Sequence, residues 1–241
     1  MLNNITQFLW FHTPLLYWTQ SLWRDEAFSV WIAQDGIMEA IRRTSGDFNP
    51  PLYYILLNFW MRIFGRNEVL LRGMSVLFFI LFLLVVYKFA LIIFKKVVPA
   101  RITVLFMALN PMLLYFAFEL RMYSLLCLFA TLSMYYFYTK SGRGYIFATI
   151  LGLYTQPFMV FVVISQMIQL LFNKKFRQIL VNSVLLFILY LPWISTLYMQ
   201  FKSSGPMWMY PLNVTTVTTV LGNVFMGYEG TPGNLWIWTG I

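Results

Sequence analysis

Charge is scarce in this 241-residue chain, and cysteine is nearly absent. Only 10% of the residues are charged, against about a quarter in ordinary soluble domains. The single cysteine, Cys127, lies in an apolar run, which excludes an intramolecular disulfide and a metal site built on cysteines. The N-terminus also lacks the basic start and the small-residue cleavage site of a signal peptide. We therefore expect Ile5–Leu22 to be a weak first membrane helix.

Apolar residues make up 60% of the chain, and the mean hydropathy is +0.71. Val69–Phe94 alone exceeds the roughly 20 residues that a helix needs to cross the hydrocarbon core of a bilayer. The sequence therefore predicts an all-α polytopic membrane protein in which residues 1–241 form one transmembrane domain. A net charge of +9 does not indicate nucleic-acid binding, because the basic residues lie in short clusters between apolar stretches.

These basic clusters predict the topology. They are Lys95, Lys96 and Arg101; Lys140 and Arg143; and Lys174, Lys175 and Arg177. Short loops rich in Lys and Arg lie in the cytoplasm, so all three clusters should share that side. The segments between them are then expected to be a hairpin bent at Asn110-Pro111, two short helices broken near Gln156-Pro157, and a span at Gln178–Met199 with a kink at Pro192. One more embedded helix is expected within Val214–Ile241.

The segment 23–68 has a mixed character and is predicted to form two amphipathic helices in the membrane interface, on the non-cytoplasmic side. Asn49 is the expected N-cap of the second helix, with Pro50 at its first position. All eight acidic residues fall in segments that this topology places outside. An acid-rich external face can bind cations or supply bases to a reaction.

Asp25 and Glu26 are adjacent carboxylates that directly follow the first apolar helix. On a regular helix they point about 100° apart, so one would react while the other orients or coordinates. The alternative, that the pair only stabilises the dipole of the following helix, is equally compatible with the sequence. Glu119 and Arg121 lie at the tip of the expected hairpin, where ionisable groups indicate function; an ion pair that ends the two helices is the alternative.

Two further features have a more ordinary interpretation or a weaker functional one. Glu68 and Arg72 have the i, i+4 spacing and order of a helix-start ion pair. Lys202, near the aromatic stretch Trp208–Tyr210, is a weaker candidate for lining an external cavity.

Several motifs resemble GT-C membrane glycosyltransferases, and most closely the glycosyltransferase family 39 type, which includes protein mannosyltransferases and aminoarabinose transferases. The motifs are Leu22-Trp23-Arg24-Asp25-Glu26-Ala27-Phe28-Ser29, Asn49-Pro50-Pro51-Leu52-Tyr53-Tyr54, Phe64-Gly65, Glu68 to Arg72, Glu119-Leu120-Arg121-Met122-Tyr123, Leu153-Tyr154-Thr155 and Leu191-Pro192-Trp193. The sequence departs from the family pattern at Asn49 and Gln156, where the family often has His.

The resemblance implies a GT-C-like helix bundle that transfers a sugar from a polyprenyl-phosphate donor on the external face. The acceptor would be a lipid, a glycan or a protein, and the partners would include membrane lipids. The catalytic acids would be Asp25, Glu26 and Glu119, with Asp25 as general base in an inverting displacement. Arg121, Arg72 and Lys202 would hold the phosphate, Tyr123 and Asn49 would contact substrate, and a divalent cation would bind Asp25 and Glu119.

Two other functions remain open from the sequence. A transporter or lipid flippase also places charges in a membrane, although it predicts a repeated architecture with ionisable groups near mid-membrane, and no internal repeat is seen. The family's later helices and C-terminal portion have no counterpart here, so we expect the chain to be the front portion of a longer protein. A non-catalytic fragment or assembly subunit is thus the third possibility.

Overall fold

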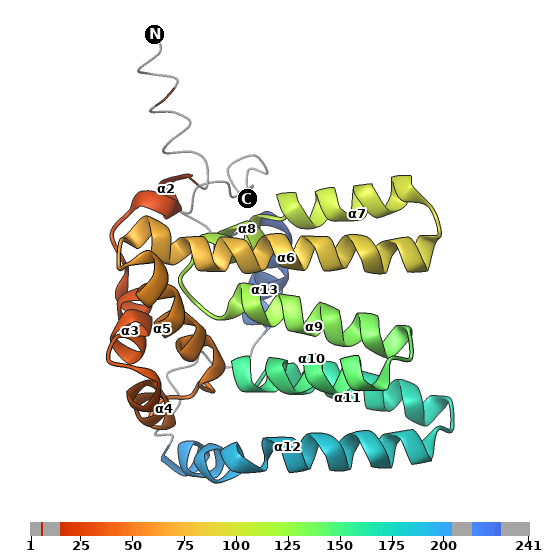
Figure 1. Ribbon diagram of the computed structural model, residues 1–241. Coiled ribbons are helices and arrows are strands. Elements are labelled where there is room, and N and C mark those ends of the chain that lie inside the picture. Colours follow the sequence, from red (N-terminus) through yellow and green to blue (C-terminus); the bar gives the residue numbers. More distant parts are fainter. Residues whose placement is uncertain (1–5, 7–14, 204–213, 228–241) are drawn as a thin grey trace.

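The computed structural model describes residue 6, residues 15–203 and residues 214–227, and the regular structure within these ranges is helical. Figure 1 shows helices lying side by side in a bundle, with α3 (Arg24–Ala33), α4 (Ile37–Ser45) and α5 (Leu52–Phe64) grouped at one end of it. The other helices are α2 (Leu15–Thr19), α6 (Glu68–Phe94), α7 (Val97–Leu109), α8 (Pro111–Phe118), α9 (Tyr123–Tyr138), α10 (Gly142–Thr155), α11 (Met159–Phe172), α12 (Phe176–Ser203) and α13 (Val214–Met226). The predicted all-α fold is confirmed.

α6 contains the stretch predicted as the clearest membrane span. Its 27 residues extend about 40 Å at 1.5 Å per residue, which exceeds the hydrocarbon thickness of about 30 Å. Asn67 caps the helix by accepting a hydrogen bond from the Val69 amide at 3.0 Å. By length and composition α6 and α12 can each cross a bilayer, and the bent pair α7–α8 counts as a third span if it crosses as one unit.

Two helix breaks lie where the sequence predicts them. α7 and α8 meet at Asn110 with a bend of 62°, because Pro111 cannot continue the preceding helix. The Asn110 side chain accepts from the Leu113 amide and donates to the Val224 carbonyl of α13. The second break separates α10 from α11 around Gln156-Pro157. Pro192, in contrast, lies inside α12, which continues to Ser203.

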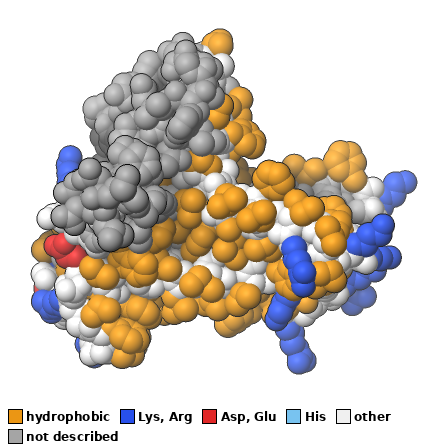
Figure 2. All heavy atoms as spheres, turned by 90° about the horizontal axis from the view of Figure 1, so that it is seen from above, with side chains coloured by type: hydrophobic (Ala, Val, Ile, Leu, Met, Phe, Trp, Pro, Cys, Tyr) orange, Lys and Arg blue, Asp and Glu red, His pale blue; other side chains and the backbone are white. Residues whose placement is uncertain are grey.

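The three basic clusters lie at one end of the bundle. They fall at the α6–α7, α9–α10 and α11–α12 turns, which Figure 1 shows together at the end away from α3, α4 and α5. In Figure 2 many Lys and Arg side chains gather at that end, whereas the visible Asp and Glu atoms lie at the other, where some basic side chains also occur. We call these the basic end and the acidic end. The three clusters thus share one end of the bundle, and their place on the cytoplasmic side stays a prediction.

The segment between the first apolar stretch and α6 differs from the prediction. It forms three helices rather than two, because Gly36 adopts a φ of 107° and interrupts the expected continuous helix between α3 and α4. The predicted N-cap of α5 is also wrong. Pro51 is the N-cap residue and the helix begins at Leu52. Asn49 instead donates its side-chain amide to Asp47 at 3.0 Å.

Two predictions fall wholly or partly outside the described residues. The first membrane helix, Ile5–Leu22, is described only at Thr6 and from residue 15 onward, where α2 is a short helix. The embedded helix expected within Val214–Ile241 corresponds to α13, and residues 228–241 lie outside the described part.

The buried core surrounds α6, and the outward surface of the bundle is apolar. Leu57 of α5, Leu71 and Met74 of α6, and Leu125 of α9 are among its fully buried members. Large side chains on outer faces are exposed, including Phe106, which is 72% exposed on α7. Such a continuous apolar exterior requires a lipid environment, so the chain is an integral membrane protein.

Candidate active site at the acidic end

The start of α3 places the two adjacent carboxylates in different surroundings. Glu26 is 1% exposed, whereas the side chain of Asp25 is 43% exposed. The difference follows from the helix, since successive side chains point about 100° apart. One carboxylate is therefore part of the protein interior, and the other is open to a reactant.

Glu26 and Arg72 form a buried, two-pronged ion pair between α3 and α6. Arg72 Nε lies 2.9 Å from Glu26 Oε1, and an Arg72 Nη lies 2.5 Å from Oε2. The guanidinium also donates to the carbonyl of Gln20 at 2.6 Å and to those of Trp18 and Ser21 at 3.3 Å. Arg72 is 0% exposed. Its guanidinium is therefore enclosed by protein groups in this structure, and the phosphate contact that the resemblance implied stays untested.

The Glu26 carboxylate also ties α3 to the link between α8 and α9. The Leu120 amide donates to Glu26 Oε1 at 2.9 Å, although the two residues are 94 positions apart. The predicted helix-start pair between Glu68 and Arg72 is wrong, because Arg72 forms its ion pair with Glu26, and within the described ranges no ion pair joins it to Glu68. The Glu26–Arg72 pair thus joins α3, α6 and the link between α8 and α9.

Arg121, in the link between α8 and α9, lies beside Asp25. An Nη of Arg121 is 3.9 Å from Asp25 Oδ2, and another donates to the Asp25 carbonyl at 3.4 Å. Burial opposes the charge on Arg121, but neighbouring Tyr54, Tyr123 and Asp25 more than offset this, and the pKa of Arg121 is raised. Its Nε is buried without a hydrogen-bond partner among the described residues. The site therefore holds a permanent cation with one donor still available.

Glu119, in the same link, is a buried acid. It is 6% exposed, and its Oε2 has no hydrogen-bond partner within the described part of the chain. Burial raises the pKa of Glu119 to about 8; Arg121 opposes this rise, while Glu26 and Asp25 add to it. Glu119 is therefore mostly neutral at pH 7, and the expected Glu119–Arg121 ion pair is not among those formed by the described residues.

A small cavity lies between Glu26 and Glu119 and is also lined by aromatic rings. Its volume of about 10 Å³ has room for about one water molecule. A sugar phosphate cannot enter it. A donor would have to approach from the exposed side of Asp25.

Two predicted site residues, Asn49 and Lys202, lie away from the residues around Asp25. Asn49 is bonded to Asp47, and Asp47 also lies 3.5 Å from the hydroxyl of Tyr54. Lys202 is exposed near the end of α12, and no ion pair of the described residues includes it. Neither Asp47 nor Tyr54 was predicted as a site residue, although Tyr54 ends the motif that begins at Asn49.

The structure thus brings six predicted residues into one cluster: Asp25, Glu26 and Glu119, with Arg121, its neighbour Tyr123, and Arg72, which pairs with Glu26. Among the described residues, no group of three or more His, Cys, Asp or Glu side chains is placed to hold a metal ion. The arrangement offers an exposed carboxylate next to a cation, with a buried neutral acid behind them. This combination suits proton abstraction beside a developing negative charge.

One comparison with known proteins gives a match. Residues 49–199 match the family model described as dolichyl-phosphate-mannose-protein mannosyltransferase. The matched region covers more than half of the chain and includes Arg72, Glu119 and Arg121, but it begins after Asp25 and Glu26. No curated protein and no solved structure matches the chain.

Proposed function

The chain belongs to the dolichyl-phosphate-mannose-protein mannosyltransferase family, and from this premise we propose that it transfers a sugar from a polyprenyl-phosphate donor to a lipid, glycan or protein acceptor on the non-cytoplasmic face. The observation that carries the proposal is the cluster of Asp25, Arg121 and Glu119 at the acidic end. That end lies opposite the three basic turns, which the positive-inside rule assigns to the cytoplasm. A multi-pass arrangement follows from the same rule.

Asp25 is the general base of the proposed reaction. It is the exposed member of the acidic pair, so an acceptor hydroxyl can reach it. Its carboxylate takes the hydroxyl proton while the acceptor oxygen attacks the anomeric carbon of the donor. The bond from that carbon to the phosphate oxygen breaks, and the electron pair leaves with the polyprenyl phosphate. A single displacement of this kind inverts the anomeric centre.

Arg121 stabilises the departing phosphate. Its guanidinium lies next to Asp25, and guanidinium groups bind phosphate oxygens with directed hydrogen bonds. The raised pKa of Glu119 supports this role, because a neutral Glu119 leaves the positive charge of Arg121 free to act on the phosphate. Tyr123 beside it, together with Asn49 and Lys202, are the further candidates for substrate contacts.

Glu26 and Arg72 position the reacting groups. Glu26 is adjacent to Asp25 in α3, and its carboxylate accepts a hydrogen bond from the amide of Leu120, the residue before Arg121. The buried ion pair with Arg72 fixes that carboxylate. The Glu26 carboxylate therefore positions both Asp25, the base, and Arg121, the phosphate-binding cation. This pairing replaces the phosphate-binding role that the sequence suggested for Arg72.

A divalent cation is the remaining part of the proposal. Asp25 and Glu119 would hold it, with the proton of Glu119 displaced when the cation binds, and the Oε2 of Glu119 has no hydrogen-bond partner in the described ranges. Two carboxylates plus substrate phosphate are a usual ligand set for Mg²⁺. A bound cation supplies positive charge at the phosphate. Full transfer activity after exhaustive treatment with a chelator would exclude it.

The experiment that tests the proposed function follows both halves of a labelled donor. Purified full-length chain in liposomes receives mannosyl-labelled dolichyl phosphate mannose together with membrane extract as acceptor. The proposal predicts label in a new product, release of dolichyl phosphate in equal amount, and an inverted anomeric centre. Movement of the intact donor across the bilayer without release would identify a flippase instead. Retention of the donor in its original form and leaflet would identify a fragment without activity.

A further inference from the structure

The α11–α12 turn at the basic end gathers three basic side chains within four residues. They are Lys174, Lys175 and Arg177. Lys174 adopts a left-handed φ of 55°, a conformation that is unfavourable for residues with a side chain. Hydrogen bonds from the Lys174 and Lys175 amides to the last carbonyls of α11, both at 2.9 Å, hold the turn. These hydrogen bonds therefore fix the backbone positions from which the basic side chains extend.

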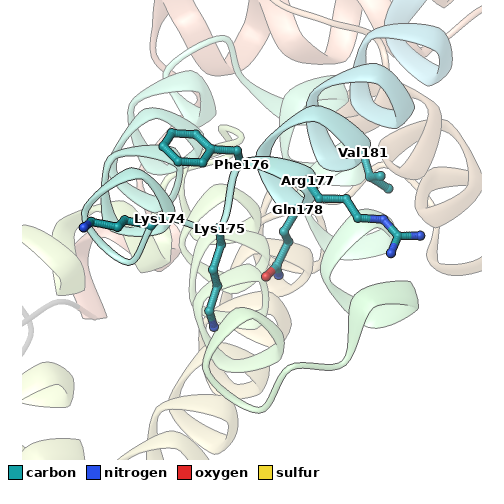
Figure 3. Close-up of a pocket in the computed structure, with 6 residues that line it drawn as sticks. All are labelled: Lys174, Lys175, Phe176, Arg177, Gln178 and Val181. Atoms are coloured by element: carbon teal, nitrogen blue, oxygen red, sulfur yellow. The ribbon is translucent and has the colours of Figure 1, made fainter.

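These side chains line an open hollow. Its volume is about 650 Å³, and it is bordered by Lys174, Lys175, Phe176, Arg177, Gln178 and Val181. Figure 3 shows Lys175 and Gln178 extending in one direction from the turn, with Lys174 and Arg177 to either side. Three cations and an amide thus border the open hollow, with Lys174 and Arg177 pointing to opposite sides.

The positive charge at this turn is uncompensated. The sequence has no Asp or Glu from residue 120 to residue 228. Within the described ranges, no carboxylate lies within 4.0 Å of Lys174, Lys175 or Arg177. An anion is the complementary ligand.

The surroundings of the hollow select a lipid over a soluble anion. Apolar side chains on both helices are exposed next to the cations: Phe172 by 82%, Phe176 by 62%, Leu180 by 65% and Val181 by 46%. A soluble phosphate would leave these groups without a partner. The acyl chains of a phospholipid would cover them while its phosphate meets the cations, as basic pockets between helices do at a membrane surface.

We propose that the α11–α12 basic hollow binds the phosphate headgroup of an anionic phospholipid, in the leaflet next to the basic end. The site is at the opposite end of the bundle from Asp25 and Arg121 (Figure 1). It is separate from the polyprenyl-phosphate donor, and the proposal does not depend on the proposed sugar transfer.

The test compares two triple variants of the full-length chain by native mass spectrometry in detergent. One is Lys174→Gln, Lys175→Gln, Arg177→Gln. The matched control is Lys95→Gln, Lys96→Gln, Arg101→Gln, which removes the same residue types around the α6–α7 turn, where Lys95 has a nearly identical φ of 54°. Phosphatidylglycerol is titrated against phosphatidylcholine, and inorganic phosphate and glycerol phosphate are added in separate arms.

The proposal predicts one tightly held phosphatidylglycerol per chain in the wild type and in the control. In the α11–α12 variant its affinity falls roughly 100-fold, at about fivefold per removed charge. Phosphatidylcholine should not be retained, and inorganic phosphate should not displace the lipid. An equal loss in both triple variants would show general attraction to a basic surface and overturn the proposal. Full displacement by inorganic phosphate or by glycerol phosphate would overturn the choice of a lipid.

Discussion

Replacing Arg72 by methionine isolates the contact on which the proposed site depends. The variant leaves the Glu26 carboxylate buried without its cation, and it removes the donors to the carbonyls of Gln20, Trp18 and Ser21. Breaking a buried ion pair by removing one partner costs about 3–5 kcal/mol. At 2–4 °C per kcal/mol for a chain of this size, the apparent Tm should fall by roughly 6–20 °C.

The assay is a thermal scan of the full-length protein in detergent, followed by intrinsic fluorescence at a fixed heating rate. Glu26→Gln together with Arg72→Met removes both buried charges and keeps an acceptor for the Leu120 amide, so it should recover about half of the loss. Arg42→Gln is the control, because the Arg42 side chain, which pairs with Glu39, is 73% exposed. The Tm of this variant should stay within error of the wild type. An Arg72→Met protein as stable as Arg42→Gln would show that the buried ion pair does not stabilise the site.

Three other predictions test neighbouring parts of the structure. The folded protein keeps a proton on Glu119 up to about pH 8, whereas the unfolded chain loses it near the ordinary pKa of glutamate. Stability should therefore fall as the pH rises from about 4.5 to 8. Glu119→Gln should flatten that fall in thermal scans, and an unchanged slope would contradict the buried neutral acid. Arg121→Gln should lower the transfer rate roughly 100-fold or more, with Arg121→Lys intermediate, and equal rates in all three proteins would remove Arg121 from phosphate stabilisation. Gly144→Ala places a methyl group 2.6 Å from the Tyr136 ring, whereas Gly142→Ala meets nothing within 4 Å. Gly144→Ala should therefore lower the free energy of unfolding by about 1–3 kcal/mol, measured in the same thermal scan. Equal stability of the two variants would contradict the close packing of α9 on α10.

Much of the helical architecture was predictable because it depends on local features of the sequence. The apolar run of α6 is long enough to cross a bilayer, and Asn110-Pro111 and Gln156-Pro157 interrupt helices because proline lacks the amide donor. The basic turns followed from the positive-inside rule. What failed was equally local. The expected continuous helix across α3 and α4 overlooked Gly36, whose φ of 107° allows the chain to turn.

The candidate site was predictable only as a set of residues, not as a set of contacts. Asp25, Glu119 and Arg121 were identified from motifs and from the cost of ionisable groups near a membrane. The partner of Arg72 was not, because the i, i+4 rule favours Glu68, whereas burial selects Glu26, 46 positions away. The contact between Glu26 and the Leu120 amide spans 94 positions. No pattern in a single sequence connects such distant segments.

The most direct test of the account is the transfer rate of Asp25→Asn in the labelled-donor assay. The control is Asp35→Asn, which removes another partly exposed acid, one paired with Arg43 between α3 and α4. We expect Asp25→Asn to lower transfer by at least roughly 100-fold with an unchanged apparent Tm, while Asp35→Asn transfers at the wild-type rate. Transfer by Asp25→Asn at the wild-type rate would contradict the assignment of the acidic end as the site of sugar transfer.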